Sequence, residues 1–353
     1  MEFTRRQLLK YGAGAGVALY LPWELGTQKA FGSPVTVPSL PGTSIPQYKR
    51  PLVIPPVMPR TGTALRRGGK NADYYEIAVR QFNQQILPTS LPETTVWSFG
   101  SAGAPGTVFE GGSFHYPALT IEARWRRPVR VKWINDLTKA NGGFLPHILP
   151  VDPTLHWANP PGGNAGRDDR PDFASTPGPY TGPVPFVTHL HGGEMTPPEA
   201  DGYPEAWFLP AANNIPGGFA TTGTFYDVFR QSSPLGGAWA PGTAVFEYPN
   251  EQRATTLWYH DHTLGMTRLN VYAGPAGFYL LRGGPTDVGG RLPRPAPALG
   301  DRPGVSYYEI PIVIQDRSFN SDGSLFYPDS REFFDGYAGP YIGAEACDGA
   351  QSD

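Results

Sequence analysis

The residues best suited to chemistry are four of the chain's seven histidines, which form two alternating pairs. The pairs are His189 with His191 and His260 with His262, each separated by one residue. Successive side chains of a β-strand point to opposite faces, so each pair should present both imidazoles on one face of its strand. Two such strands side by side would bring four imidazoles together. Imidazole is a ligand for copper, zinc, iron and nickel, so the pattern predicts a metal site.

A plainer interpretation exists for any one of these pairs. A single His-x-His is also found on a solvated strand face or in a local hydrogen-bonding arrangement. Both pairs here lie in apolar, aromatic-rich segments, and this context favours the metal site. The remaining histidines, His115, His147 and His156, belong to no spaced pair, and we expect them to lie on the surface or in loops.

Short strands are predicted to hold these histidines in place. Alternating apolar and polar residues with many aromatic and β-branched side chains are typical of half-buried strands. Such segments occur throughout the chain, at 74–82, 94–99, 116–123, 129–135, 265–281 and 308–315. Turns rich in glycine and proline separate them. This pattern of short strands and turns predicts an all-β sandwich.

Composition limits the classes of protein to consider. The net charge of −3 is close to neutral, so no nucleic-acid partner is expected. The 44 glycines and 41 prolines would approach low complexity, but the plentiful aromatic and β-branched residues favour short strands joined by loops. Cys347 is the single cysteine, so no internal disulfide can form.

The N-terminal residues 1–32 are predicted to be an export signal. Arg5 and Arg6 lie in a twin-arginine pattern that differs from the usual one by having Leu8 where phenylalanine is commonest. The weakly apolar run behind them, Tyr11 to Leu21, is shorter than the roughly 20 residues of a membrane span. We therefore expect twin-arginine export to the periplasm or the outside, and no membrane span. The alternative is a chance Arg-Arg pair in a cytosolic protein.

The rest of the chain divides at stretches rich in proline and glycine. A Pro-rich lead-in covers 33–70, a first sandwich domain covers 71–282, a linker covers 283–304, and the start of a second domain covers 305–353. Within the first domain, residues 138–183 form a long loop with little periodicity, which we expect to be either functional or mobile.

Six motifs, taken in order, resemble the multicopper oxidases. Within that family the resemblance is nearest to the branch that contains bacterial spore-coat laccases, bilirubin oxidases and phenoxazinone synthase. It extends from about Tyr74 to about Tyr327. The motifs are TIEA at 120–123, VKWIN at 131–135, HLHGG at 189–193, DGYPEAWF at 201–208, WYHDH at 258–262 and TRLNVYAG at 267–274.

The resemblance implies cupredoxin-like Greek-key β-sandwich domains and a cluster of copper ions. By resemblance, His189 would bind the type 2 copper, and His191, His260 and His262 would bind the type 3 pair. Asp201 matches the acidic residue that assists proton delivery to dioxygen, although its spacing from the first pair is longer by one residue. An ordinary loop carboxylate is the alternative for this aspartate.

Neighbouring side chains on the histidine strands have more open roles. Leu190, Tyr259 and Asp261 would lie on the opposite strand faces, where they pack or form hydrogen bonds that orient the rings. Trp258 shares the face of the second histidine pair. A plain core position is favoured for it, with a wall of the metal site as the alternative.

The chain also departs from the family pattern. No histidine follows His262, and Cys347 lies between Ala346 and Asp348, so the type 1 copper ligands are absent from the sequence. The second domain offers only one convincing strand, which cannot complete a sandwich. The sequence therefore indicates the N-terminal portion of a multicopper oxidase, with a second polypeptide as a possible source of the C-terminal cupredoxin domain.

Two functions remain open at this stage. The first is an oxidoreductase, laccase-like or bilirubin-oxidase-like, which supplies half of the trinuclear copper cluster and reduces dioxygen with electrons from a small phenolic or similar donor. The second is a non-catalytic copper-binding module or an inactive truncated fragment. Copper content and turnover of a phenolic dye would separate them.

Overall fold

The computed structural model describes residues 38–52, 54–66, 69, 71–173, 177–287 and 310–329. The predicted export signal at 1–32 lies outside these residues, as does most of the predicted linker. The boundary between a first and a second domain therefore stays a prediction.

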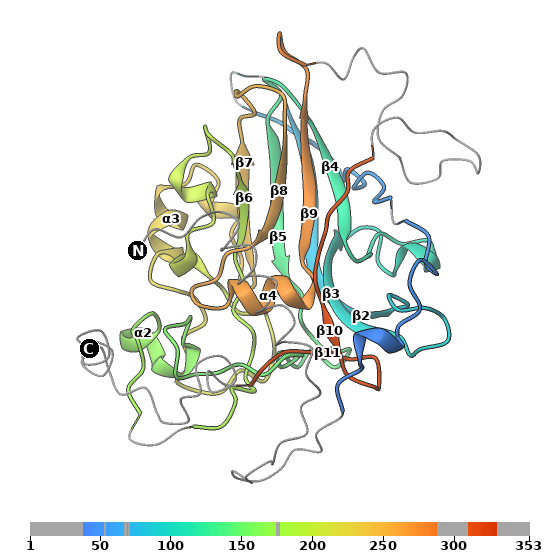
Figure 1. Ribbon diagram of the computed structural model, residues 1–353. Helices are drawn as coiled ribbons and strands as arrows, with labels where there is room; N and C mark the ends of the chain where they lie inside the picture. The colour runs from blue at the N-terminus through green and yellow to red at the C-terminus, as the bar shows by residue number, and fades with distance from the viewer. Residues whose placement is uncertain are drawn as a thin grey trace, which may run out of the picture. The chain divides into compact units, whose positions relative to one another are not determined.

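Two β-sheets pack face to face to form the body of the protein (Figure 1). In one sheet the strands follow the order β1-β2-β5-β7, and β3 also pairs with β2. In the other sheet the order is β4-β9-β8-β6. Pairing is antiparallel except between β2 and β5 and between β4 and β9. The strands are β1 Gly62–Ala64, β2 Ala72–Gln84, β3 Thr94–Ser101, β4 Ala118–Arg124, β5 Val129–Asn135, β6 Thr188–His191, β7 Thr243–Tyr248, β8 Thr255–Asp261 and β9 Ala276–Arg282.

Alternation of side chains builds the core between these sheets. In β5, Val129, Val131 and Trp133 are buried while the residues between them are partly exposed. The Trp133 ring lies 5.4 Å from that of Phe99 on β3 and 5.5 Å from that of Tyr259 on β8. Aromatic side chains from both sheets therefore fill the interior, and the predicted all-β sandwich is confirmed.

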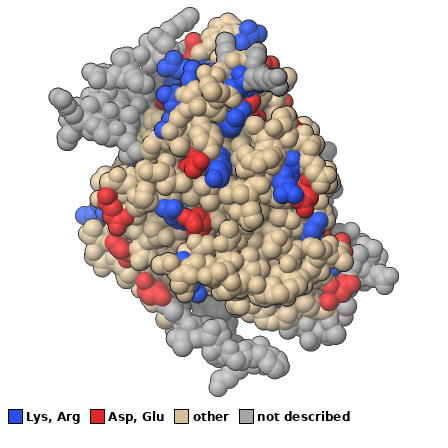
Figure 2. Space-filling model, turned by 180° about the vertical axis from the view of Figure 1, so that it is seen from behind, with Lys and Arg blue, Asp and Glu red and all other residues tan. Residues whose placement is uncertain are grey.

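Ion pairs join neighbouring parts of the five-stranded sheet. Arg130 on β5 lies 2.7 Å from Glu247 on β7, and Arg127 lies 2.6 Å from Asp73 on β2. Burial raises the pKa of Asp73, but Arg127 and Arg60 outweigh it, and the net pKa is lowered. Figure 2 shows basic side chains gathered toward the upper end of that view, with acidic ones among them.

One predicted strand is partly a helix. The sequence predicts a strand over 265–281, but only its last part is a strand, β9. Thr267–Ala273 forms a helix, α4, at the lower end of β8 and β9 in Figure 1. Met266, Leu269 and Ala273 are buried, a spacing of three and four residues that follows the helical period. The other helices are short: α2 Gly163–Gly166, α3 Tyr226–Ser232, and the 3-10 helices η1 Gly42–Ser44, η2 Val108–Glu110, η3 Pro160–Gly162, η4 Pro198–Ala200, η5 Pro204–Ala206 and η6 Gly236–Ala238. No helix among the described residues is long and apolar enough to span a membrane.

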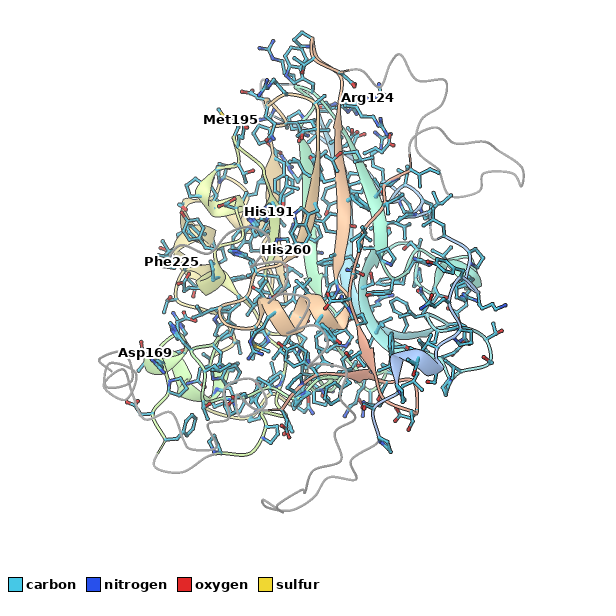
Figure 3. The ribbon with its side chains drawn as sticks, in the orientation of Figure 1. Arg124, Asp169, His191, Met195, Phe225 and His260 are labelled. Carbon is cyan, nitrogen blue, oxygen red and sulfur yellow. The ribbon has the colours of Figure 1, made fainter. Side chains whose placement is uncertain are left out.

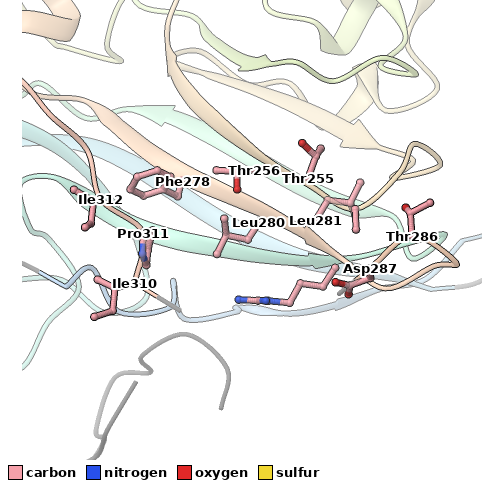
Figure 4. Close-up of a pocket in the computed structure, with 12 residues that line it drawn as sticks. Thr255, Thr256, Phe278, Leu280, Leu281, Thr286, Asp287, Ile310, Pro311 and Ile312 are labelled. Atoms are coloured by element: carbon pink, nitrogen blue, oxygen red, sulfur yellow. The ribbon is translucent and has the colours of Figure 1, made fainter. Parts of the chain in front are cut away.

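The strand predicted at 308–315 is also wrong for its described part. Residues 310–317 pair with no strand in the described chain, and a short hairpin follows, β10 Ser318–Phe319 with β11 Leu325–Phe326. Residues 310–312 instead border an open cavity of about 530 Å³ whose other walls include Phe278 and Leu280 of β9 (Figure 4). A β-branched sequence therefore does not form a strand here without a neighbouring strand to bond.

The long loop at 138–183 is packed against the sandwich in its described part. Leu149, Val151, Trp157 and Ala158 are buried and belong to the hydrophobic core. Trp157 contacts Tyr180 at a ring distance of 4.8 Å. The loop thus contributes to the core near the strands that carry the histidines.

Candidate metal centre

The two strands that carry the histidine pairs lie side by side. β6 and β8 are antiparallel neighbours, with His189 directly opposite His260 and His191 directly opposite Trp258. His262 follows the last residue of β8. This is the arrangement that alternation predicted, because cross-strand partners have side chains on the same face of the sheet.

The histidines lie on the face of the four-stranded sheet that points away from the core. One ring nitrogen each of His189, His191 and His260 lies within 4.8 Å of the others. The His262 ring joins this group at 4.7 Å from the His189 ring. Figure 3 shows His191 and His260 close together beside β6 and β8. The structure thus brings all four predicted histidines together.

Backbone carbonyl groups orient three of these imidazoles. Nδ1 of His189 lies 2.5 Å from the Asp201 carbonyl oxygen, Nδ1 of His260 lies 2.6 Å from that of Asp261, and Nδ1 of His262 lies 3.1 Å from that of Gly202. A neutral imidazole that donates from Nδ1 leaves the Nε2 lone pair free for a metal. Fixing the second nitrogen in this way is typical of metal-binding histidines, so the residues fit a metal ion.

The close approach of the loop to β6 requires a glycine. Gly202 has φ +75°, and a Cβ at this position would lie 2.2 Å from the Thr188 carbonyl oxygen. Only glycine adopts this conformation at such a short distance without strain. Gly202 thereby allows consecutive carbonyl groups, those of Asp201 and Gly202 itself, to reach His189 and His262.

The electrostatics keep the buried imidazoles neutral. Burial lowers the pKa of His260 to about 4, and the neighbouring histidines add to the effect. Burial and the proximity of His189 also lower the pKa of His262. Neutral imidazole is the form that binds a metal, so these rings are in the binding form at neutral pH.

Asp261, between the second pair, belongs to the opposite face. Its carboxylate accepts hydrogen bonds from Thr263 Oγ1 at 2.7 Å and Thr263 N at 3.0 Å, inside the protein. Burial raises its pKa to about 7 despite these bonds. Tyr259 and Leu190 are buried on the same inner face, where they pack, so these side chains brace the strands and do not bond the imidazoles.

The side chain of Asp201 lies at the edge of the centre. Its carboxylate Oδ1 is 3.5 Å from Nδ1 of His189, and the side chain is 37 % exposed. The carboxylate therefore faces both solvent and the clustered histidines. This position would suit a group that passes protons from water to the centre.

Trp258 differs from expectation, and the three unpaired histidines have different surroundings. The predicted core position of Trp258 is wrong, because the side chain is 37 % exposed and stacks on His260 with ring centroids 3.9 Å apart. His115 lies in a loop, one of the two expected placements, and is buried there. His147, in the loop, is partly buried, its Nε2 is 3.0 Å from Asn270 Oδ1, and burial lowers its pKa to about 3. His156 is exposed, as expected.

Sequence reasoning missed the groups that orient the rings. A backbone carbonyl is present in every residue, so nothing in the sequence marks those of Asp201 and Gly202 as partners. The glycine after the aspartate was the available signal, since it permits a close backbone contact. The stacking of Trp258 on His260 corresponds to the alternative in which Trp258 forms a wall of the site.

Similar proteins were found by sequence. A laccase from Bacillus stratosphericus is 37 % identical over 255 residues, which are 72 % of this chain and 36 % of the relative. A laccase from Haloferax volcanii is 37 % identical over 341 residues, 96 % of this chain and 44 % of the relative. Multicopper oxidase LPR1 from Arabidopsis thaliana is 33 % identical over 236 residues, 67 % of this chain and 29 % of the relative. The chain thus spans less than half the length of these curated relatives.

Among solved structures, a multi-copper oxidase from Pediococcus acidilactici aligns with a TM-score of 0.45 at 18 % identity. The alignment covers 80 % of this chain and 38 % of that one. No family model matches the chain.

Proposed function

Because this chain belongs to the multicopper oxidase family, we propose that it contributes four histidine ligands to a copper centre that reduces dioxygen to water. The observation that carries the proposal is the convergence of His189, His191, His260 and His262 on the outer face of one sheet. Copper held there would supply the redox chemistry that a four-electron reduction of dioxygen requires.

The hydrogen bonds of each histidine ring indicate which of its two nitrogens is free to bind a metal. His189, His260 and His262 have Nδ1 against a carbonyl oxygen, so each presents Nε2. His191 instead presents Nδ1, which lies 3.4 Å from Nε2 of His260. Two nitrogens at this separation can both reach one ion at an imidazole–metal distance of about 2 Å. This supports His191 and His260 as ligands of a shared type 3 copper.

The remaining assignments rest on the family resemblance. His189 would bind the type 2 copper, and His262 would complete the type 3 ligands contributed by this chain. Their rings lie 4.7 Å apart, which supports neighbouring ions. The other half of the cluster ligands, and the type 1 copper through which electrons arrive, come from protein outside this sequence, such as a second polypeptide carrying the C-terminal cupredoxin domain.

Asp201 is the group we assign to proton delivery. Its carboxylate lies between solvent and His189, within reach of water on one side and the centre on the other. A carboxylate in that position can accept a proton from bulk water and pass it inward. Asp201→Asn keeps the side-chain shape and removes this capacity. In a complete oxidase, the variant should lower turnover while copper content stays unchanged.

The physiological setting follows from the N-terminal sequence. The twin-arginine pattern at Arg5 and Arg6 supports export of the chain to the periplasm or the outside. Replacing both arginines with lysine should leave the protein in the cytoplasmic fraction. Equal export of the variant would contradict the assignment.

The reducing substrate would be a phenol or a similar small donor.

The alternative is a copper-binding module without turnover. It is favoured by the number of ligands, since four histidines are half of what the family's cluster uses. Purified protein loaded with copper should be assayed for copper per chain and for oxidation of a phenolic dye, alone and with a C-terminal cupredoxin domain added. Turnover only in the mixture supports the proposal. Bound copper with no turnover in either case supports the module.

A further inference from the structure

His191 is held differently from the other three imidazoles. Carbonyl oxygens of Asp201, Asp261 and Gly202 accept hydrogen bonds from the other three rings. Within the described chain, no carbonyl oxygen accepts a hydrogen bond from a ring nitrogen of His191. The side chain is also exposed. Rotation about the final side-chain bond of histidine has a broad energy profile, so such a ring would sample several orientations on its own.

Trp258 is placed to limit that rotation. It is the direct cross-strand neighbour of His191 and lies two residues before His260 on the same face of β8. Its ring centroid is 5.2 Å from that of His191 at an interplanar angle of 32°, and 3.9 Å from that of His260 at 26°. One indole therefore lies against both imidazoles whose nitrogens approach to 3.4 Å.

We propose that Trp258 is a positioning residue for the metal site, which stacks on His191 and His260 and keeps their facing nitrogens ready for one ion. The inference rests on the proposed function, because it assumes that these two histidines are ligands. The indole takes the role that a carbonyl oxygen has for His189 and His262. It is not itself a ligand, since indole offers no lone pair for a metal.

The exposure of Trp258 separates this role from a structural one. A tryptophan that served mainly to fill the core would be buried, whereas Trp258 is 37 % exposed on the outer face. Phe278 lies opposite Trp258 on β9 and shares that face, but none of the described ring contacts joins it to a histidine. Phe278→Leu is therefore a matched control for losing an aromatic side chain at this surface.

The test is a Cu(II) titration of the full chain, with competition against a chelator of known affinity. Trp258→Leu should weaken copper binding by about tenfold, as expected when a group that orients a ligand is lost. Trp258→Phe retains a ring for stacking and should recover most of the affinity, and F278L should match the unchanged protein. Urea unfolding of each variant shows whether the fold is retained.

Coupling with His191 decides between positioning and a nonspecific effect. Trp258→Leu should have a much smaller effect in a chain that already carries His191→Ala, because the ring that depends on Trp258 alone is gone and the Asp261 carbonyl oxygen still holds His260. An equal tenfold loss in both backgrounds, or no loss in W258L, would overturn the inference. Copper binding that is unaffected by H260A would instead overturn the ligand assignment itself, so the two failures are distinguishable.

Discussion

The two faces of the four-stranded sheet have different roles, although the same strands form both. On the inner face of β8, Leu257 and Tyr259 are buried in the core that both sheets share. On the outer face, Trp258 is partly exposed and His260 belongs to the group of histidines that could hold a metal ion. Alternation along one strand thus separates residues that hold the fold from residues of the candidate metal centre, with no change in the backbone.

Packing on the inner face makes the site rigid, while its position on the outer face keeps it accessible. The inner residues anchor β8: the Tyr259 hydroxyl donates to the Leu119 carbonyl oxygen at 2.6 Å, and its ring contacts Phe99 and Trp133. Because the same strand carries both faces, this anchoring also fixes the backbone of the imidazoles on the outer face. Substitutions on the inner face should therefore reduce stability, and substitutions of the histidines or Trp258 on the outer face should reduce copper binding.

The largest expected effect is on the inner face. Tyr259→Ala removes a fully buried ring and leaves the Leu119 carbonyl without its donor. It should lower the free energy of unfolding by about 3–5 kcal/mol. Trp258→Ala, one residue away on the outer face, should cost less than about 1 kcal/mol. Urea unfolding of the two variants measures both, and equal losses would remove the distinction between the faces.

A smaller loss is expected from overpacking the same contact. Gly277 on β9 is opposite Tyr259, and an added Cβ would lie 2.5 Å from the tyrosine ring and hydroxyl. Gly277→Ala should therefore displace the ring and cost about 1–3 kcal/mol. Gly217→Ala is the control, because a Cβ there meets nothing within 4 Å. A neutral Gly277→Ala would mean that the inner face is loosely packed.

The smallest effect is the net pH dependence of stability, because the two faces contribute with opposite signs over overlapping pH ranges. Burial raises the pKa of Asp261 to about 7 from the ordinary 3.8, so the folded state retains a proton that the unfolded state loses, and stability falls as pH rises through this range. For His260 the pKa is lowered to about 4 from 6.5, so the unfolded state binds the extra proton and stability rises with pH.

Asp261→Asn should remove the falling contribution. In metal-free protein, the variant should gain stability relative to the unchanged chain as pH rises from about 4 to about 7. Urea unfolding midpoints near the two ends of that range test it. The same pH dependence in both proteins would show that the carboxyl of Asp261 ionises without difficulty in the fold.

The sequence predicted most of the strands that position the site. β5 has the expected bounds, and the alternation of the histidines correctly placed His189, His191 and His260 on one face. Helix α4 was missed because its apolar residues satisfy a strand pattern as well as a helical one until burial distinguishes them. Alternation also gave the face of Trp258 but not its exposure, which depends on what covers that face.

The partners of the imidazoles could not be predicted for a different reason. They are carbonyl oxygens, which every residue has, and their positions depend on how the loop around Gly202 returns to β6. The resemblance to multicopper oxidases supplied the identity of the metal, whereas the residues alone were compatible with several ions.

The most direct test of the central claim is copper content after His260→Ala. The chain should be loaded with Cu(II), freed of excess by gel filtration, and analysed for copper per chain beside His156→Ala, which removes an exposed histidine outside the site. The convergence of the four imidazoles predicts that H260A loses copper while H156A retains it. Unchanged copper in H260A would contradict the assignment of the outer face as the metal centre.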